Sequence, residues 1–150
     1  DHVDDDSEVD SGKVSSKIEK SFRVDVGCSN PFVVDQPKEG GGNNEGPNPL
    51  EVFLAGLSSC LCTVGKIVAM QQRIKVRSIE AEVEGDIDKD FLMGATTEGR
   101  AGFTEIRTVV KIDADITNEE KEAFLAEIER RCPIADNIAN TTKMTAEVVG

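Results

Sequence analysis

The sequence predicts an α+β protein with a largely antiparallel sheet packed on a long central helix. Three observations support this prediction: several short segments alternate apolar and polar residues, residues 48–72 carry an apolar stripe at helical spacing, and a second capped helix begins at Thr117. Alternation with a period of two is typical of strands that bury one face, as antiparallel sheets do. The predicted order of elements is β-β-α-β-β-α-α-β.

The amino-terminal part of the chain predicts a β-hairpin and a loop. KIEKSFRVDVGC, at residues 17–28, alternates and predicts a strand with Cys28 packed on its apolar face. SNP then predicts a turn, and FVVD, at 32–35, a second strand. The glycine-rich segment at 36–48 lacks the GK[ST] ending of a phosphate-binding loop, so we expect a flexible connector.

Residues 48–72 predict one long, largely buried helix. Asn48 is suited to cap it, Pro49 fits the first turn, and Glu51 follows the cap by three residues, as in a capping box. Small residues on the rest of its surface would allow another backbone or a second subunit to approach closely. The apolar stripe consists of Leu50, Phe53, Leu54, Leu57, Leu61, Val64 and Val68.

The second half of the chain predicts two strands, at 75–88 and 103–116, joined by an irregular excursion that carries Phe91, Leu92 and Met93. A T-x-x-E capping box at Thr117 opens the next helix. That helix is expected to run to about Arg131, and a short helix follows from Pro133. KMTAEVV, at 143–149, predicts a closing strand.

Length and charge restrict the possible functions. The 150 residues predict an acidic flexible tail at 1–13 and a single domain at 14–150. A net charge of −12 argues against nucleic-acid and anionic-membrane partners. We see no apolar run of transmembrane length and no signal-peptide pattern, so we expect a cytoplasmic protein, although a removed targeting segment would leave the same chain.

The scarcity of histidine argues against several kinds of active site. His2, in the acidic tail, is the only histidine, which disfavours a Ser-His-Asp triad, a Cys-His pair and a histidine-rich metal site. Four cysteines remain, and the composition is not that of a small secreted disulfide scaffold. We therefore expect reduced or redox-cycling thiols.

Cys60 and Cys62 have to be considered separately. On a helix they point about 200° apart, so they cannot hold one metal ion together. Cys60 lies at the margin of the apolar stripe, where core packing and chemistry are both possible. Cys62 lies on the far side of the helix, where a small packing residue is expected.

Cys132 precedes Pro133, and a residue before proline is disfavoured in helical geometry. Pro133 suits the first position of the next helix, which leaves Cys132 at the N-cap. Unpaired backbone N–H groups at that position favour a thiolate. From the residues alone, Cys132 is the cysteine that we expect to be reactive.

GPNPLEVFLAGLSSC, followed some seventy residues later by RRCPIADNI, resembles the OsmC/Ohr superfamily of thiol-dependent peroxidases. The resemblance covers roughly residues 20–149 and is closer to the general OsmC-like branch than to dedicated organic hydroperoxide resistance proteins. It implies the OsmC-like fold and an intertwined homodimer. It also implies that Cys60 is the peroxidatic cysteine and Cys132 the resolving cysteine, which reverses the order suggested by local reasoning.

The implied chemistry is antioxidant and needs no metal or organic cofactor. The Cys60 thiolate would reduce an organic hydroperoxide to an alcohol, and the resulting sulfenic acid would condense with Cys132 to a disulfide. An external dithiol, a dihydrolipoyl group in many family members, would restore both thiols. Apolar residues near Cys60, with Phe91, Leu92 and Met93 from the mobile excursion, would favour fatty or aromatic peroxides over hydrogen peroxide.

The sequence departs from the family pattern at the pair of residues that activates the first cysteine. In the family, an arginine activates this cysteine and is held by a glutamate that commonly lies ten residues before the cysteine. Leu50 stands at that position here, and Glu51 follows it. Arg23 and Glu51 are therefore the candidates for the activating pair. Alternatively, Arg23 is simply an exposed arginine on a strand, and Glu51 only caps the helix. Two other functions stay open: a non-catalytic dimer that binds an apolar small molecule, and a dithiol–disulfide exchange protein.

Overall fold

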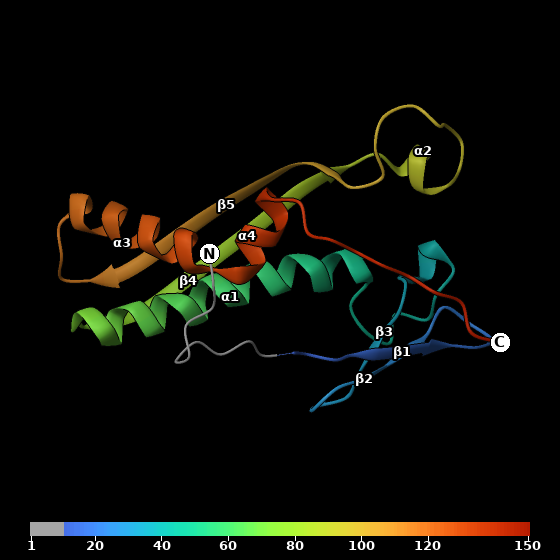
Figure 1. Ribbon diagram of the computed structural model, residues 1–150, viewed down its shortest axis with the longest axis horizontal. Coiled ribbons are helices and arrows are strands. Elements are labelled where there is room, and N and C mark those ends of the chain that lie inside the picture. The colour runs from blue at the N-terminus through green and yellow to red at the C-terminus, as the bar shows by residue number, and fades with distance from the viewer. Residues whose placement is uncertain (1–10) are drawn as a thin grey trace. The chain divides into compact units, whose positions relative to one another are not determined.

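The computed structural model describes residues 11–150, so most of the predicted acidic tail lies outside the described residues. The chain divides by its internal contacts into two units, one ending at Val52 and the other running from Phe53 to Gly150. Figure 1 shows the elements of both units, and each unit is described by itself. The mixed α+β class with antiparallel pairing and one long helix is confirmed.

The first unit contains a three-stranded antiparallel sheet in the order β1-β2-β3. Its strands are β1 (Ser15–Ile18), β2 (Val24–Gly27) and β3 (Phe32–Val34). The prediction of one strand over 17–28 is wrong, because this segment turns back on itself between β1 and β2. At the turn, the Ser21 hydroxyl accepts the Arg23 N–H at 3.3 Å, a local bond that competes with strand pairing.

The glycine-rich loop after β3 is built around a buried carboxylate. The side chain of Asp35 is 1% exposed and accepts the backbone N–H groups of Gln36, Asn43 and Glu45 at 2.7, 3.2 and 3.1 Å. The backbone N–H of Asp35 donates to the Pro47 carbonyl. The expectation of a flexible connector is therefore wrong, since the carboxylate satisfies backbone donors that a loop otherwise leaves to water.

A short 3-10 helix, η1 (Lys38–Gly40), lies within this loop. It ends at Gly41, whose φ of 93° is in the left-handed region that favours glycine.

The long helix α1 runs from Pro49 to Gln72, as predicted. Its capping box is confirmed: Asn48 accepts the Glu51 N–H at 2.9 Å, and Glu51 accepts the Asn48 N–H at 3.1 Å. Contrary to the sequence expectation, α1 is long and apolar enough to cross a bilayer by length and composition. Its buried residues belong to the core of the second unit, which is typical of the central helix of a soluble fold.

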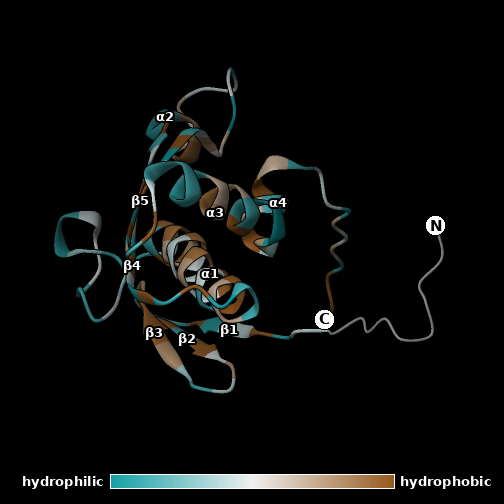
Figure 2. Ribbon diagram, turned by 90° about the vertical axis from the view of Figure 1, so that its left-hand side faces the viewer, coloured by the Kyte–Doolittle hydropathy of each residue, from teal (hydrophilic) through white to brown (hydrophobic). Residues whose placement is uncertain are grey.

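In the second unit, α1 packs with a long β-hairpin and two further helices (Figure 1). The hairpin consists of β4 (Val76–Ile87) and β5 (Phe103–Ala114), paired antiparallel, with the short helix α2 (Lys89–Leu92) at its tip. The chain continues into α3 (Asn118–Arg131) and α4 (Pro133–Ala139). Figure 2 shows hydrophobic residues recurring along α1, whereas α3 shows both hydrophobic and hydrophilic residues.

The core of the second unit is formed by one face each of α1, β5 and α3, together with Cys132. Its buried members are Leu57, Leu61, Val64, Val68, Ala69, Ile112, Ala114, Phe124, Ile128 and Cys132. The half-buried apolar residues of β4 pack against this cluster, as the alternation in the sequence predicts.

Two predictions about the second unit have opposite outcomes. The capping box of α3 is confirmed, with reciprocal bonds between Thr117 and Glu120. The closing strand at 143–149 is wrong, because residues 141–150 form no regular element and Met144 and Val148 are 89% and 98% exposed. Alternation alone does not make a strand, since a strand needs a partner for its backbone groups.

Candidate active site

Cys60 and Cys132 lie side by side although 72 residues separate them in the sequence. Their Sγ atoms are 3.0 Å apart. Cys60 comes from the middle of α1, and Cys132 from the junction between α3 and α4. Two sulfurs at this separation can form a disulfide with a small adjustment of the side chains.

Cys132 is the buried member of the pair, with 0% of its surface exposed. It has an extended backbone, with φ −76° and ψ 113°, because it precedes Pro133, and it is the N-cap of α4 as predicted. The Ala135 N–H donates to Cys132 Sγ at 3.4 Å. The sulfur therefore occupies the place that a serine or aspartate oxygen takes at an ordinary helix start.

Cys60 is the half-buried member and packs at the edge of the core. Burial raises the pKa of its thiol, and the adjacent Cys132 acts in the same direction, while the backbone N–H of Ile134 opposes them. Cys60 therefore carries less thiolate at neutral pH than an exposed cysteine would. Its advantage over Cys132 is access, because a molecule from solvent can reach only a sulfur that is partly exposed.

The other two cysteines have different surroundings. Cys62 points away from Cys60, and its thiol donates to the Ile79 carbonyl at 3.5 Å on β4, as the helical separation predicts. Cys28 was expected on the apolar face of a strand, and this is wrong. It lies after β2 in the turn before β3, half-buried, and its thiol donates to the Asn30 carbonyl.

Arg23 and Glu51 belong to the first unit, and the structure does not pair them with each other. Arg23 binds Glu45 and Asp25, with N–O distances of 3.0 and 3.1 Å. Glu51 is engaged in the cap of α1. Sequence reasoning missed Glu45 as a partner of Arg23, because 22 residues separate the two and no local pattern relates them.

The second unit has a hollow of about 580 Å³, and neither Cys60 nor Cys132 is among the residues that line it. Leu57 and Leu61 of α1 and Ala135 of α4, which flank the cysteines, contribute to its wall. Phe91, Leu92 and Met93 do not line this hollow either, and the expectation that they join the surface around Cys60 stays a prediction. These three residues lie in and just after α2, at the hairpin tip, where Leu92 and Met93 are exposed.

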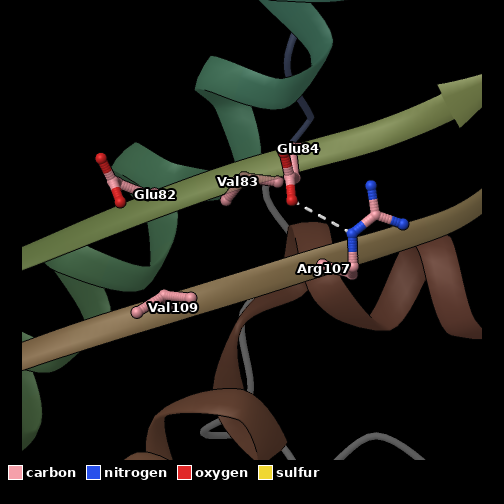
Figure 3. A pocket seen from close by; sticks show the side chains of 5 residues that line it. All are labelled: Glu82, Val83, Glu84, Arg107 and Val109. Carbon is pink, nitrogen blue, oxygen red and sulfur yellow. Dashed lines mark hydrogen bonds and ion pairs between the residues drawn. The ribbon is translucent and has the colours of Figure 1, made fainter.

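A second hollow, of about 430 Å³, lies over the β4–β5 hairpin (Figure 3). Its lining includes Glu82 and Val109, and Arg107, which reaches across to Glu84 at 3.1 Å. Arg107 also binds Asp86 at 2.8 Å. Cross-strand pairs of this kind stabilise a sheet. The hollow brings no nucleophile together with its charged groups, so the sulfur pair is the better candidate site.

Metal binding receives no support from the side-chain arrangement. Over residues 11–150, no group of three or more His, Cys, Asp or Glu side chains is placed to hold a metal ion. The chemistry available at the sulfur pair is that of the thiols themselves.

Two known proteins are similar to this chain in sequence. The chain is 32% identical over 94 residues to an uncharacterized protein of Methanocaldococcus jannaschii, a match that covers 61% of this chain and 44% of that protein. It is 24% identical over 113 residues to a protein of Mycoplasma genitalium named hydroperoxide reductase, covering 75% and 74% of the two chains. The chain thus spans less than half the length of the Methanocaldococcus relative.

A similar fold is found among solved structures. The OsmC-like protein of Mycoplasma pneumoniae superposes with a TM-score of 0.77 at 19% identity, over 88% of this chain and 89% of that one. At such identity the likeness concerns the fold alone. The sequence profile of the family described as OsmC-like protein matches residues 41–147, a range that includes both Cys60 and Cys132. The chain therefore belongs to the OsmC-like protein family.

Proposed function

We propose that this protein is a thiol-dependent peroxidase that reduces organic hydroperoxides to alcohols, with Cys60 as the peroxidatic and Cys132 as the resolving cysteine. The observation that carries the proposal is the 3.0 Å contact between a half-buried and a fully buried sulfur. Cys60, the half-buried member, can meet a peroxide, whereas the buried Cys132 can meet only its neighbour. Membership of the OsmC-like family and the name of the Mycoplasma genitalium relative support the same function.

The reaction begins with attack of the Cys60 thiolate on the terminal oxygen of the hydroperoxide. The O–O bond breaks, Cys60 becomes a sulfenic acid, and the alkoxide takes a proton and leaves as the alcohol. The Cys132 thiol then attacks the Cys60 sulfur, water leaves, and a disulfide joins the two residues. An external dithiol, such as a dihydrolipoyl group, reduces the disulfide by two exchange steps and is itself oxidised.

We also propose a role for the N-terminus of α4, because Cys132 is more deeply buried than Cys60. When a reductant attacks the disulfide, it reaches the Cys60 sulfur, and Cys132 leaves as a thiolate. The Ala135 N–H, at 3.4 Å from Cys132 Sγ, is placed to stabilise that charge. Hydrogen bonding to the charged form of a group favours that form.

Arg23 stays our candidate for a cation that activates Cys60, but we now propose Glu45 rather than Glu51 as its carboxylate partner. The pairing of Arg23 with Glu45 supports Glu45 as the residue that holds the guanidinium, while Glu51 caps α1. We expect Arg23→Ala to slow peroxide reduction and Glu51→Gln to lower only the stability of α1. These two results would assign activation of Cys60 to Arg23 and a capping role to Glu51. A homodimer and a cytoplasmic location complete the proposal.

The test is consumption of cumene hydroperoxide with dithiothreitol as the reductant. We expect turnover by the wild type and by the matched control Cys62→Ser, and loss of turnover in Cys60→Ser. One equivalent of peroxide without reductant should remove two hydrogens and yield a peptide linked through Cys60 and Cys132. Equal rates for wild type and Cys60→Ser would refute the peroxidase. The two alternatives would then remain: a protein that binds an apolar small molecule, and an exchange protein that acts on the disulfides of other proteins.

A further inference from the structure

The guanidinium of Arg23 is held by two carboxylates of the first unit. Nε and Nη2 donate to Asp25 of β2 at 3.3 and 3.1 Å, and Nη1 donates to Glu45 at 3.0 Å. A guanidinium has five N–H groups, so two of them have no partner within residues 11–150. The direction in which these two N–H groups point depends on where the two carboxylates are held.

Glu45 depends on the fold for its position, whereas Asp25 does not. Asp25 is two residues from Arg23 along the chain, so their pairing is local. Glu45 lies 22 residues away, in the loop that follows β3. Its side chain is 43% exposed, so close packing around the carboxylate does not fix it. What places Glu45 beside Arg23 is therefore the backbone of the loop.

The buried carboxylate of Asp35 anchors this backbone. Its Oδ2 accepts the N–H of Glu45 at 3.1 Å and the N–H of Asn43 at 3.2 Å. Its Oδ1 accepts the N–H of Gln36 at 2.7 Å, and its backbone N–H donates to the Pro47 carbonyl at 3.0 Å. Because the side chain is 1% exposed, water does not compete for these donors. One residue thus joins the beginning of the loop to its end.

The same loop also contacts the residue next to Arg23. A Cβ at Gly41 would come within 3.1 Å of Phe22 Cε2, so the loop backbone packs closely on the Phe22 ring. A Cβ at Gly42 would come within 2.7 Å of Asp35 Oδ1, which leaves no room for a side chain beside the carboxylate. The loop therefore meets the Phe22–Arg23 segment at two points, and both belong to the part that Asp35 anchors.

We infer that Asp35 is a positioning residue for Arg23: by fixing the backbone of Glu45, it fixes where Glu45 holds the guanidinium. Arg23 is the cation that the proposed function assigns to the activation of Cys60, so the catalytic consequence of this role rests on that function. A cation stabilises a developing charge best when its donors are already oriented. Without the Asp35 carboxylate, Arg23 keeps its local bonds to Asp25 and loses the fixed position of its second partner.

The first measurement follows the guanidinium itself and needs no substrate. In proton–nitrogen NMR spectra, the Arg23 Nε–H signal should move in Asp35→Asn in the same direction as in Glu45→Gln. Asp35→Ser keeps a single side-chain acceptor and should move the signal further. Glu39→Gln, on the exposed η1 helix of the same loop, should leave the signal at its wild-type position. A wild-type Arg23 signal in both Asp35 variants would overturn the inference.

The second measurement is the second-order rate constant of Cys60 with cumene hydroperoxide. Asp35→Asn should lower it about three- to tenfold, and Arg23→Ala should lower it at least as much. In Arg23→Ala combined with Asp35→Asn, the rate constant should equal that of Arg23→Ala alone, because no guanidinium is left to position. Glu39→Gln should react like wild type.

A purely structural role for Asp35 gives a different pattern, in which Asp35→Asn slows wild type and Arg23→Ala by the same factor. That result would overturn the inference. If Cys60 reacts and Arg23→Ala is as fast as wild type, the catalytic consequence is wrong. If wild type consumes the peroxide no faster than Cys60→Ser, the peroxidase itself is refuted, and the NMR measurement still decides whether Asp35 positions Arg23.

Discussion

Cys132 Sγ lies 3.0 Å from Cys60 Sγ and accepts the Ala135 N–H at 3.4 Å, so one sulfur is both a helix cap and a partner for oxidation. This arrangement joins α1, the end of α3 and the start of α4 at a single point. Proline at the second position after Arg131 makes it possible, because it ends α3 at Cys132 and begins α4.

Removal of Cys132 should change the fate of oxidised Cys60. In the wild type the buried thiol meets a new sulfenic acid at once, so we expect a disulfide and little further oxidation. In Cys132→Ser, the sulfenic acid should persist and proceed to sulfinic acid as peroxide increases. Intact-mass spectrometry after graded peroxide measures both products, with Cys62→Ser as the control that should resemble wild type. Equal sulfinic acid in wild type and Cys132→Ser would contradict a resolving role.

The pH dependence of Cys60 oxidation should reflect its raised pKa. Burial and the Cys132 contact raise the pKa of the Cys60 thiol above its ordinary value of 9.0. Below that pKa, the thiolate increases about tenfold for each pH unit, so the second-order rate constant with cumene hydroperoxide should still be rising above neutral pH. Stopped-flow measurement across the pH range tests this. A plateau reached below neutral pH would mean that a cation outside the second unit lowers the pKa.

Replacement by alanine at two glycines of α1 should affect the stability of the protein differently. A Cβ at Gly56 would meet no atom within 4 Å, so Gly56→Ala should stabilise the helix by about 1 kcal/mol. A Cβ at Gly65 would come within 2.5 Å of Ile79 Cδ1 and 3.2 Å of Ile128 Cδ1, so Gly65→Ala should be less stable than Gly56→Ala. Urea unfolding of both variants decides this. Destabilisation by Gly56→Ala would indicate that another subunit covers that surface.

Asp35 should contribute stability that acid removes. Burial by itself would raise the pKa of its carboxyl, but the N–H groups of Glu45, Gln36 and Asn43 and the charge of Arg23 together lower it. Because the folded-state pKa is below the ordinary 3.8, the contribution is present above 3.8 and is lost as the pH falls through the folded-state value.

The matching experiment uses Asp35→Asn, in which an amide replaces one acceptor oxygen of the carboxylate. Its urea midpoint should be below that of wild type near neutral pH, and the difference should shrink as the solution is acidified below about pH 4. Glu39→Gln, on the exposed η1 helix of the same loop, should follow wild type throughout. A difference between wild type and Asp35→Asn that stays constant with pH would show that the Asp35 charge does not stabilise the loop.

The sequence by itself determined the elements whose causes are local. Helix α1 and its cap at Asn48, helix α3 with its Thr117–Glu120 box, and the position of Cys132 before Pro133 all follow from patterns within a few residues. Strands β4 and β5 were also predictable, because their period-two alternation is long enough to be distinct. The family resemblance added the roles expected of Cys60 and Cys132.

Only the tertiary structure decided which distant groups meet. It brought Cys60 to Cys132, gave Arg23 the partner Glu45, and buried Asp35 under three backbone donors. It also left the alternating segment 143–149 without strand pairing and put a turn inside 17–28. The physical reason is the same throughout: caps and stripes are stabilised by neighbours along the chain, whereas buried contacts and strand pairs depend on residues that only the folded chain brings together.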